Sequence, residues 1–333
     1  MMLGRRGLAA GLGGLALGTG MVRGARAQGA AGGWKPDRPA RIVVPFTPGG
    51  STDILARALA AELQEVFGQP FVVENRGGAG GTIGTEVVAH APPDGLTLMM
   101  GHIGTLAVNP ALYPNLPFDT ATAFAPIVLA AIVPNILVVN PKSFPKGGVP
   151  ELIALAKSKP GALSYGSGGN GSAAHIAAVA FSLAAGIEMT HVPYRGTAPM
   201  MNDLISGTID LTLTGGPPVL PPVRAGMLRA LGVTSLDRLS AAPELPTMAE
   251  QGLPGFEATQ WYGLVAPART PPEIINRFNV ECTRILKSAK LQPRLEAEGA
   301  VAAPDTPEAF GRFITAERER WGEVVRRANV QAN

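Results

Sequence analysis

The sequence is poor in cysteine and in charge. Cys282 is the only cysteine among 333 residues, and Asp, Glu, Lys and Arg together make up 16% of the chain. A single cysteine excludes an internal disulfide, and with it a disulfide-stabilised scaffold. Aliphatic residues are plentiful, which excludes intrinsic disorder, and the 42 glycines follow no period, which excludes a collagen-like chain.

Long hydrophobic runs are also missing. Beyond residue 27, no apolar run approaches the ~18 residues that a membrane-spanning helix needs. The sequence therefore excludes a membrane transporter. A length of 333 residues with 46% hydrophobic content instead suggests a globular protein of about two domains.

The motifs of common hydrolases are absent as well. The four histidines, His90, His102, His175 and His191, show neither H-x-x-x-H nor H-E-x-x-H spacing, and no cysteine cluster accompanies them. No G-x-S-x-G nucleophile elbow occurs. We therefore expect no metal, no cofactor and no catalytic residue.

The basic residues are concentrated at the N-terminus. Four of the 28 basic residues are arginines within 1–27, which contains no acid, so the remainder carries 24 basic against 25 acidic residues. This near-neutral balance gives no support to nucleic-acid binding. Arg5-Arg6, a Gly/Ala/Leu stretch and Ala25-Arg26-Ala27 are typical of a signal peptide, with cleavage expected before Gln28 and residence in the periplasm. The arginine pair leaves open whether export uses the general or the twin-arginine route.

Strand and helix patterns alternate after a polar linker at 28–38. Strands are expected at 41–46, 71–74, 96–100, 135–139, 163–165, 188–192, 209–214, 228–233 and 261–266. Helices are expected at 53–67, 82–90, 149–158, 172–185, 198–206, 218–225, 272–288, 290–298 and 307–328, and irregular chain at 109–124. The alternation predicts an α/β protein with right-handed βαβ units and mostly parallel sheets.

These elements fall into two α/β sets, which we call lobe I and lobe II. We expect lobe I to contain residues 28–134 and 260–333, and lobe II to contain residues 135–259. A C-terminal segment that returns to the first sheet would make two crossings between the lobes, and such an arrangement suits a hinged clamshell.

Two glycine-rich turns are the strongest candidates for a binding site. FTPGGSTD at 46–53 and YGSGGNGS at 165–172 each follow a strand and open a helix. Missing Cβ atoms, exposed backbone N–H groups, hydroxyls and the positive end of a helix dipole together favour an anion such as a carboxylate. Either turn alone could also be an ordinary strand-to-helix connection with capping serines. A third glycine cluster, ENRGGAGGT at 74–82, could add N–H groups at the same edge of the first sheet.

Single residues near these turns leave alternatives open. Asp53 could contact a ligand or merely face its own helix dipole. His102 directly follows a strand and could reach the rim of a cleft. Arg195 could bind an anion in a bidentate manner or lie solvated on the surface. Cys282 falls on an apolar helix stripe and is expected to be a core residue.

The second turn also satisfies the dinucleotide-binding pattern G-x-G-x-x-G at Gly166, Gly168 and Gly171. The acid that would bind a ribose, Glu188, begins its strand instead of ending it, and the motif lies in the middle of the chain and not in a first βαβ unit. We therefore expect no dinucleotide.

Ten short motifs of the sequence resemble those of a known family. The resemblance is carried by VPFTPGGSTD (44–53), ENRGGAGG (74–81), PDGLTL (93–98), NPALY (109–113), YGSGGNGS (165–172), VPYRG (192–196), LRALGVTS (228–235), LPTMAE (245–250), GFE (255–257) and WYGL (261–264). In this order and spacing the motifs are similar to those of the substrate-binding receptors of tripartite tricarboxylate transporters, also called Bug receptors.

The resemblance implies a type II periplasmic-binding-protein fold, in which two lobes joined by crossing strands capture a small organic carboxylate. A dicarboxylate or tricarboxylate, an acidic amino acid or an aromatic acid would fit. It implies a monomer whose partners are the membrane subunits of such a transporter or a sensor kinase. The ligand-binding residues expected are Phe46, Thr47, Pro48, Gly49, Gly50, Ser51, Asp53, Ala79, Gly80, His102, Thr105, Ser167, Gly168, Asn170, Gly171, Ser172, His175, Tyr194, Arg195 and Thr214.

The sequence departs from the family at a few positions. Leu106 stands where many members have a polar or aromatic residue, and Leu213, Thr214 and Gly215 stand where many have an aromatic, an acid and an amide. These departures leave the two turns intact and affect the distal end of the ligand. Two other functions stay open: a receptor that only signals to a sensor kinase, and a secreted enzyme that acts on a carboxylic acid.

Overall fold

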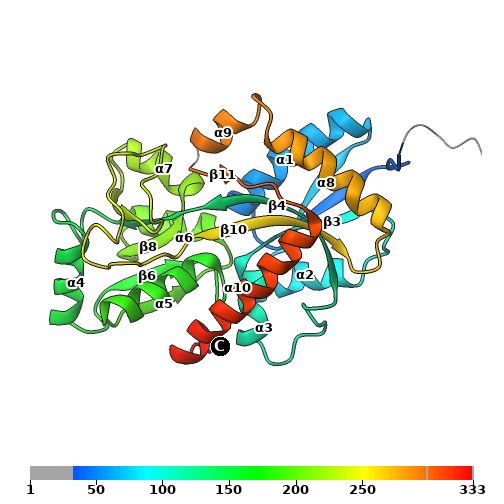
Figure 1. Cartoon of the computed structure of the whole chain (residues 1–333). Helices are drawn as coiled ribbons and strands as arrows, with labels where there is room; N and C mark the ends of the chain where they lie inside the picture. The colour runs from blue at the N-terminus through cyan, green and yellow to red at the C-terminus, as the bar shows by residue number, and fades with distance from the viewer. Residues whose placement is uncertain (1–32, 298, 332–333) are drawn as a thin grey trace, which may run out of the picture. The chain divides into compact units, whose positions relative to one another are not determined.

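The computed structural model describes residues 33–297 and 299–331, so the predicted signal peptide lies outside the described residues. Lobe I is built on a six-stranded sheet with the order β11-β4-β10-β3-β1-β2 (Figure 1). Its strands are β1 (Ala40–Val44), β2 (Phe71–Asn75), β3 (Thr97–His102), β4 (Phe124–Val133), β10 (Gln260–Pro267) and β11 (Val301–Ala302). The helices of this lobe are α1 (Ser51–Phe67), α2 (Thr82–Ala89), α3 (Asn109–Leu112), α8 (Pro272–Leu286), α9 (Gln292–Ala297) and α10 (Pro307–Arg327), with short turns η1 (Ala79–Gly81) and η2 (Gly104–Val108).

Lobe II is built on a five-stranded sheet with the order β7-β6-β8-β5-β9. Its strands are β5 (Asn135–Val139), β6 (Ser164–Ser167), β7 (Thr190–Pro193), β8 (Leu211–Gly215) and β9 (Arg229–Val233). Four helices belong to this lobe, α4 (Val149–Ser158), α5 (Ala173–Ala185), α6 (Thr197–Ser206) and α7 (Gly216–Arg224).

The expectation of mostly parallel sheets is wrong, because both sheets are mixed. Strand β1 pairs in parallel with β2 and β3, but β10 runs antiparallel to both β3 and β4. In lobe II, β6 pairs in parallel with β7 and β8, whereas β5 runs antiparallel to β8 and β9. The antiparallel pairs of β5 and β10 arise where the chain passes from one sheet to the other, since these strands are not joined to their neighbours by a βαβ crossover. Strand β11 also pairs antiparallel with β4.

Three local assignments also differ from expectation. Strand β4 was not predicted, because its run FAPIVLAAIV contains Pro126 and continues almost unbroken into β5. The two-residue strand β11 was also missed. The stretch 109–124, expected to be irregular, begins with the short helix α3.

The core of lobe I explains why α1 forms where it does. Leu55, Leu59 and Leu63 recur every fourth residue and are buried, so this face of α1 packs on β2 and α8. Gly68 ends the helix in the left-handed conformation at φ +68, which a glycine adopts without strain. Cys282 is fully buried in α8, and its predicted role as a core residue is confirmed.

The lobes are joined at two places. The chain passes from β4 through Pro134 into β5, and it returns through the segment before β10 (Figure 1). Helix α10 packs beside the second crossing, where buried Glu317 accepts hydrogen bonds from the indole nitrogens of Trp261 and Trp321, both at 2.8 Å. Within the described part of the chain, every helix is too short or too polar to span a bilayer.

Candidate functional site

A narrow cleft between the lobes contains a small inner cavity of about 30 Å³. A cavity of this size has room for an ordered water or a polar group of similar size. It lies where the parallel strands of the two sheets end, because Phe46 follows β1, His102 ends β3 and Gly168 follows β6. Its lining consists of Phe46, Thr47, Gly50, Ser51, Thr52, Asp53, His102, Gly168, Ser172, Ala173, Ala174, Thr197, Thr214, Gln260 and Tyr262.

Three helix N-termini converge on this inner cavity. Helix α1 contributes Ser51 and Thr52, α5 contributes Ala173 and Ala174, and α6 contributes Thr197. The backbone N–H groups of these residues have no acceptor in the part of the chain that the structure describes. Free N–H groups and the positive ends of three helix dipoles therefore face one small space, which favours an anion.

His102 faces the inner cavity as a neutral donor. Its Nδ1 atom accepts hydrogen bonds from the backbone N–H groups of Gly104 at 2.7 Å and Thr105 at 3.3 Å. Since Nδ1 is an acceptor, the ring proton lies on Nε2. Burial lowers the pKa of His102 to about 4, and the ring stacks on Phe46 with centroids 4.5 Å apart. A fixed, uncharged N–H donor results.

Asp53 is saturated by partners within lobe I. Its carboxylate accepts hydrogen bonds from Gly49 N–H (3.0 Å), the Asn75 amide (2.9 Å) and Arg57 (3.0 Å). Burial raises the pKa of Asp53, but the hydrogen bonds from Arg57, Asn75 and Gly49 outweigh it, so the pKa lies below its usual value. The contacts favour the view that Asp53 shapes the turn at 46–53. The lining of the inner cavity contains no lysine or arginine.

The floor of the inner cavity is polar and belongs to the two segments that cross between the lobes. The Tyr262 hydroxyl donates to the Gln260 side-chain oxygen, and the Gln260 amide donates to Asn135. Asn135 in turn donates to the carbonyl oxygen of Ala258 at 2.6 Å. This chain of hydrogen bonds ties together the two crossings between the lobes.

An outer cavity of about 210 Å³ adjoins the inner one at Phe46 and Gly168. Five more of the predicted residues line it, namely Ala79, Gly80, Asn170, Tyr194 and Arg195. The Tyr113 hydroxyl donates to Asn170 O at 3.1 Å and so joins the two lobes beside it. Arg195 is exposed at this cavity.

Six predicted residues line neither cavity, namely Pro48, Gly49, Thr105, Ser167, Gly171 and His175. Several of them hold the glycine-rich turns in place. The Ser167 hydroxyl bonds His191 Nε2 at 2.7 Å, and His175 Nδ1 accepts from Gly171 N–H at 3.0 Å. The rings of His175 and His191 stack 4.1 Å apart beneath the turn at 165–172.

Sequence reasoning missed several residues of the lining. Gln260 and Tyr262 reach the cleft only because the C-terminal segment returns to lobe I. Thr197 could have been found, since VPYRGT ends a strand and opens a helix as the other turns do. Leu106 is buried in the hydrophobic core and does not line the cleft, whereas Thr214 does.

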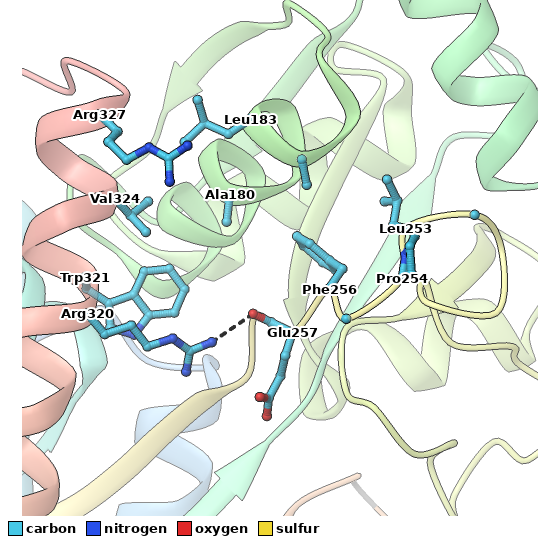
Figure 2. A pocket seen from close by; sticks show the side chains of 13 residues that line it. Ala180, Leu183, Leu253, Pro254, Phe256, Glu257, Arg320, Trp321, Val324 and Arg327 are labelled. Carbon is cyan, nitrogen blue, oxygen red and sulfur yellow. Dashed lines mark hydrogen bonds between the residues drawn. The ribbon is translucent and has the colours of Figure 1, made fainter.

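A larger hollow of about 550 Å³ lies outside the cleft, between α5, the segment 252–257 and α10 (Figure 2). Phe256 from the segment 252–257 and Trp321 from α10 line it with aromatic rings (Figure 2). Its cations are already engaged, because Arg320 donates to Glu257 O at 3.0 Å and Arg327 pairs with Glu323 at 3.8 Å. The hollow therefore lacks the convergent free donors of the cleft. No cluster of three or more metal-ligating side chains occurs among residues 33–297 and 299–331.

Two α/β lobes joined by crossing strands, with free donors around the cleft between them, define a two-lobed solute-binding protein. The chain belongs to the family described as "Tripartite tricarboxylate transporter family receptor", whose model matches residues 55–330. The family match confirms the resemblance noted in the sequence, and the members of this family are binding receptors.

Known relatives agree over nearly the whole chain. Protein BugT of Bordetella pertussis is 39% identical over 297 residues, which cover 89% of this chain and 91% of BugT. A Rhodopseudomonas palustris protein solved with adipate is 40% identical with a TM-score of 0.86, covering 89% of this chain and 99% of that one. MatC of the same species, solved with bound malate, is 33% identical with a TM-score of 0.82, covering 87% and 99%. The predicted two-lobed periplasmic-binding-protein fold is confirmed.

Proposed function

We propose that the protein is an exported receptor that captures a small organic carboxylate in the interlobe cleft and catalyses no reaction. The observation that supports this most is the convergence of the N-termini of α1, α5 and α6 on one cavity. Since the lining has no cationic side chain, these helix ends would supply the positive potential that an anion needs. An anion there would be held by backbone N–H groups, hydroxyls and the His102 donor. The adipate and malate bound by the two Rhodopseudomonas proteins support a carboxylate ligand.

We assign the twenty ligand-binding residues predicted from the sequence to two roles. Those that line the inner and outer cavities would contact the ligand or its ordered waters, and the remaining six would support the turns. We further propose that residues 28–134 and 260–333 form lobe I and residues 135–259 lobe II. Family membership favours membrane subunits of a tripartite tricarboxylate transporter as partners, acting with a monomeric receptor.

Gly168 offers a direct test of the carboxylate site. This residue lines both cavities. Its φ is not positive, and a Cβ added there meets no atom closer than 3.7 Å, so Gly168→Val should fold. The methyl groups of the valine should fill the inner cavity. Malate, adipate, citrate, glutamate and benzoate are screened by thermal shift. An acid that binds should stabilise the wild type by about 2.7 kcal/mol at a hundredfold excess over its Kd. The exposed variant Ala184→Val is the control. Equal stabilisation of Gly168→Val and the wild type by an acid would exclude this cavity as its site.

Export has its own test. Mass spectrometry of the protein purified from its native host should find a mature chain that begins at Gln28. A chain that still begins at Met1 would contradict the signal peptide and the periplasmic location.

A further inference from the structure

The two lobes touch across the cleft through positions that carry no side chain. Gly80 of lobe I lies against Asn170 O of lobe II, and a Cβ built on Gly80 would overlap that backbone oxygen. Gly196 of lobe II lies against Thr47 of lobe I, and a Cβ built on Gly196 would overlap the Thr47 hydroxyl. At Gly80 the lobes meet against a backbone oxygen, and at Gly196 they meet against the Thr47 side chain, so neither glycine leaves room for a Cβ atom.

These contacts flank the cavities. Thr47 lines the inner cavity, and Gly80 and Asn170 line the outer one. The Thr47 hydroxyl oxygen is buried and has no hydrogen-bond partner among the described residues. A buried hydroxyl without a partner is costly, so this group is suited to a ligand in the adjoining cavity.

We infer that Gly80 and Gly196 determine ligand specificity by setting how closely the lobes shut, which limits the inner cavity to a group of the size of one carboxylate. This inference rests on the function proposed above. About 30 Å³ exceeds the minimum that one ordered water needs but is far below the ~300–1,000 Å³ of pockets that enclose a whole ligand, so only a group as small as a carboxylate fits. A side chain at either glycine would keep the lobes apart, and donors on opposite lobes could not reach the same carboxylate.

Gly80→Ala tests this with a closely matched control. Gly80 has φ +61, a conformation that alanine adopts with some strain, and Gly186 at the end of α5 has the same φ of +61 with no atom within 4 Å of an added Cβ. Gly186→Ala therefore places an alanine in the same left-handed region without any overlap. The new methyl group of Gly80→Ala would meet Asn170 O and the Tyr113 hydroxyl that donates to it, so it lies at the contact between the lobes.

Malate and adipate serve as probes, with Kd measured by isothermal titration and the radius of gyration by small-angle scattering. For the acid that the wild type binds, Gly80→Ala should weaken binding at least about tenfold and reduce the contraction on binding, because overlap with a backbone atom forces the lobes apart. Gly186→Ala should match the wild type in both measurements. Thermal unfolding of both variants checks that they fold.

The outcomes separate the two ideas. If neither acid binds the wild type or Gly186→Ala, the proposed capture of such carboxylates fails. If the wild type binds and folded Gly80→Ala binds equally well with the same contraction, the glycines do not set the closing distance. Should Gly80→Ala not fold, Gly196→Ala and its combination with Thr47→Gly replace it, since removing the Thr47 side chain removes the three atoms nearest to the new Cβ. If Gly196→Ala acts by overlapping Thr47, then Gly196→Ala combined with Thr47→Gly should bind as tightly as Thr47→Gly alone. Weaker binding by the double variant than by Thr47→Gly would overturn the inference.

Discussion

The side-chain amide of Gln260 donates a hydrogen bond to the side-chain oxygen of Asn135, although the two residues are 125 positions apart in the sequence. Asn135 begins β5, just after the first crossing between the lobes, and Gln260 begins β10, just after the second. Both side chains are buried. The bond therefore fixes the spacing of the two crossing segments at the point where the lobes would hinge.

Replacing Asn135 should destabilise the fold. Asn135→Ala removes the acceptor of the Gln260 amide and one of two donors to Ala258 O, which keeps the hydrogen bond from the Thr234 hydroxyl at 2.9 Å. One buried polar group, the Gln260 amide, is left unpaired, so we expect the free energy of unfolding to fall by about 1–3 kcal/mol in urea denaturation. Asn202→Ala, at an exposed position of α6, is the control. A loss below 1 kcal/mol for Asn135→Ala would show that the hinge does not depend on this pair.

The contribution of α6 to anion binding can be isolated at its first residue. Thr197→Ala removes the hydroxyl but keeps the backbone N–H, whereas Thr197→Pro removes both and is tolerated at the first position of a helix. Since a hydrogen bond to a charged group contributes about 1.5–3 kcal/mol, Thr197→Pro should bind the carboxylate at least about tenfold more weakly than Thr197→Ala. Titration calorimetry measures the difference. Equal affinities of the two variants would exclude the Thr197 N–H as a ligand donor.

Helix α10 holds the second crossing through Glu317. This buried carboxylate accepts from both Trp261 and Trp321, so Glu317→Ala leaves two indole N–H groups unpaired and should lower the free energy of unfolding by about 2–5 kcal/mol. Glu317→Gln retains an acceptor oxygen and should lose less. Equilibrium denaturation followed by tryptophan fluorescence compares the two. If both variants lost the same amount, the acceptor at this position would not be what stabilises the crossing.

Much of this architecture could be read from the sequence because local patterns determine it. The strand-turn-helix segments around Gly49 and Gly168 carry glycines, hydroxyls and helix starts in one short stretch, and the structure brings Gly168 and the neighbours of Gly49 to one cleft. The division into two sheets also followed from the alternation of strands and helices. Such features need no knowledge of distant contacts.

The parts that could not be predicted depend on contacts far apart in the sequence. Strand β4 contains Pro126 and is followed by Pro134, so its local signals suggested a break and not a ten-residue strand. The antiparallel direction of β10 follows from its entry at the second crossing, which local periodicity does not record. Gln260 and Tyr262 reach the cleft through the same pairing.

Acid should destabilise the protein through two buried histidines, His102 and His175, and the half-buried His191. Burial lowers the pKa of His102 to about 4 and of His191 to about 4, and burial together with the charge of His191 lowers the pKa of His175 to about 3. Because these folded-state values lie below the value of about 6.5 in an unfolded chain, the unfolded state binds more protons in between. The free energy of unfolding should thus be highest above pH 6.5 and fall as the pH drops toward 4, by up to about 1.4 kcal/mol per pH unit for each histidine.

The contribution of a single ring can be separated by substitution. His191→Gln removes one titrating group but retains a partner for the Ser167 hydroxyl, so the decline between pH 6.5 and 4.5 should become about one third shallower. His90→Gln, at an exposed position of lobe I, is the matched control and should leave the slope as it is. Urea denaturation at half-unit pH steps gives the slopes. A wild-type stability that stays level from pH 7 to 4.5 would mean that the three rings become protonated without unfolding, and that water reaches them in the folded protein.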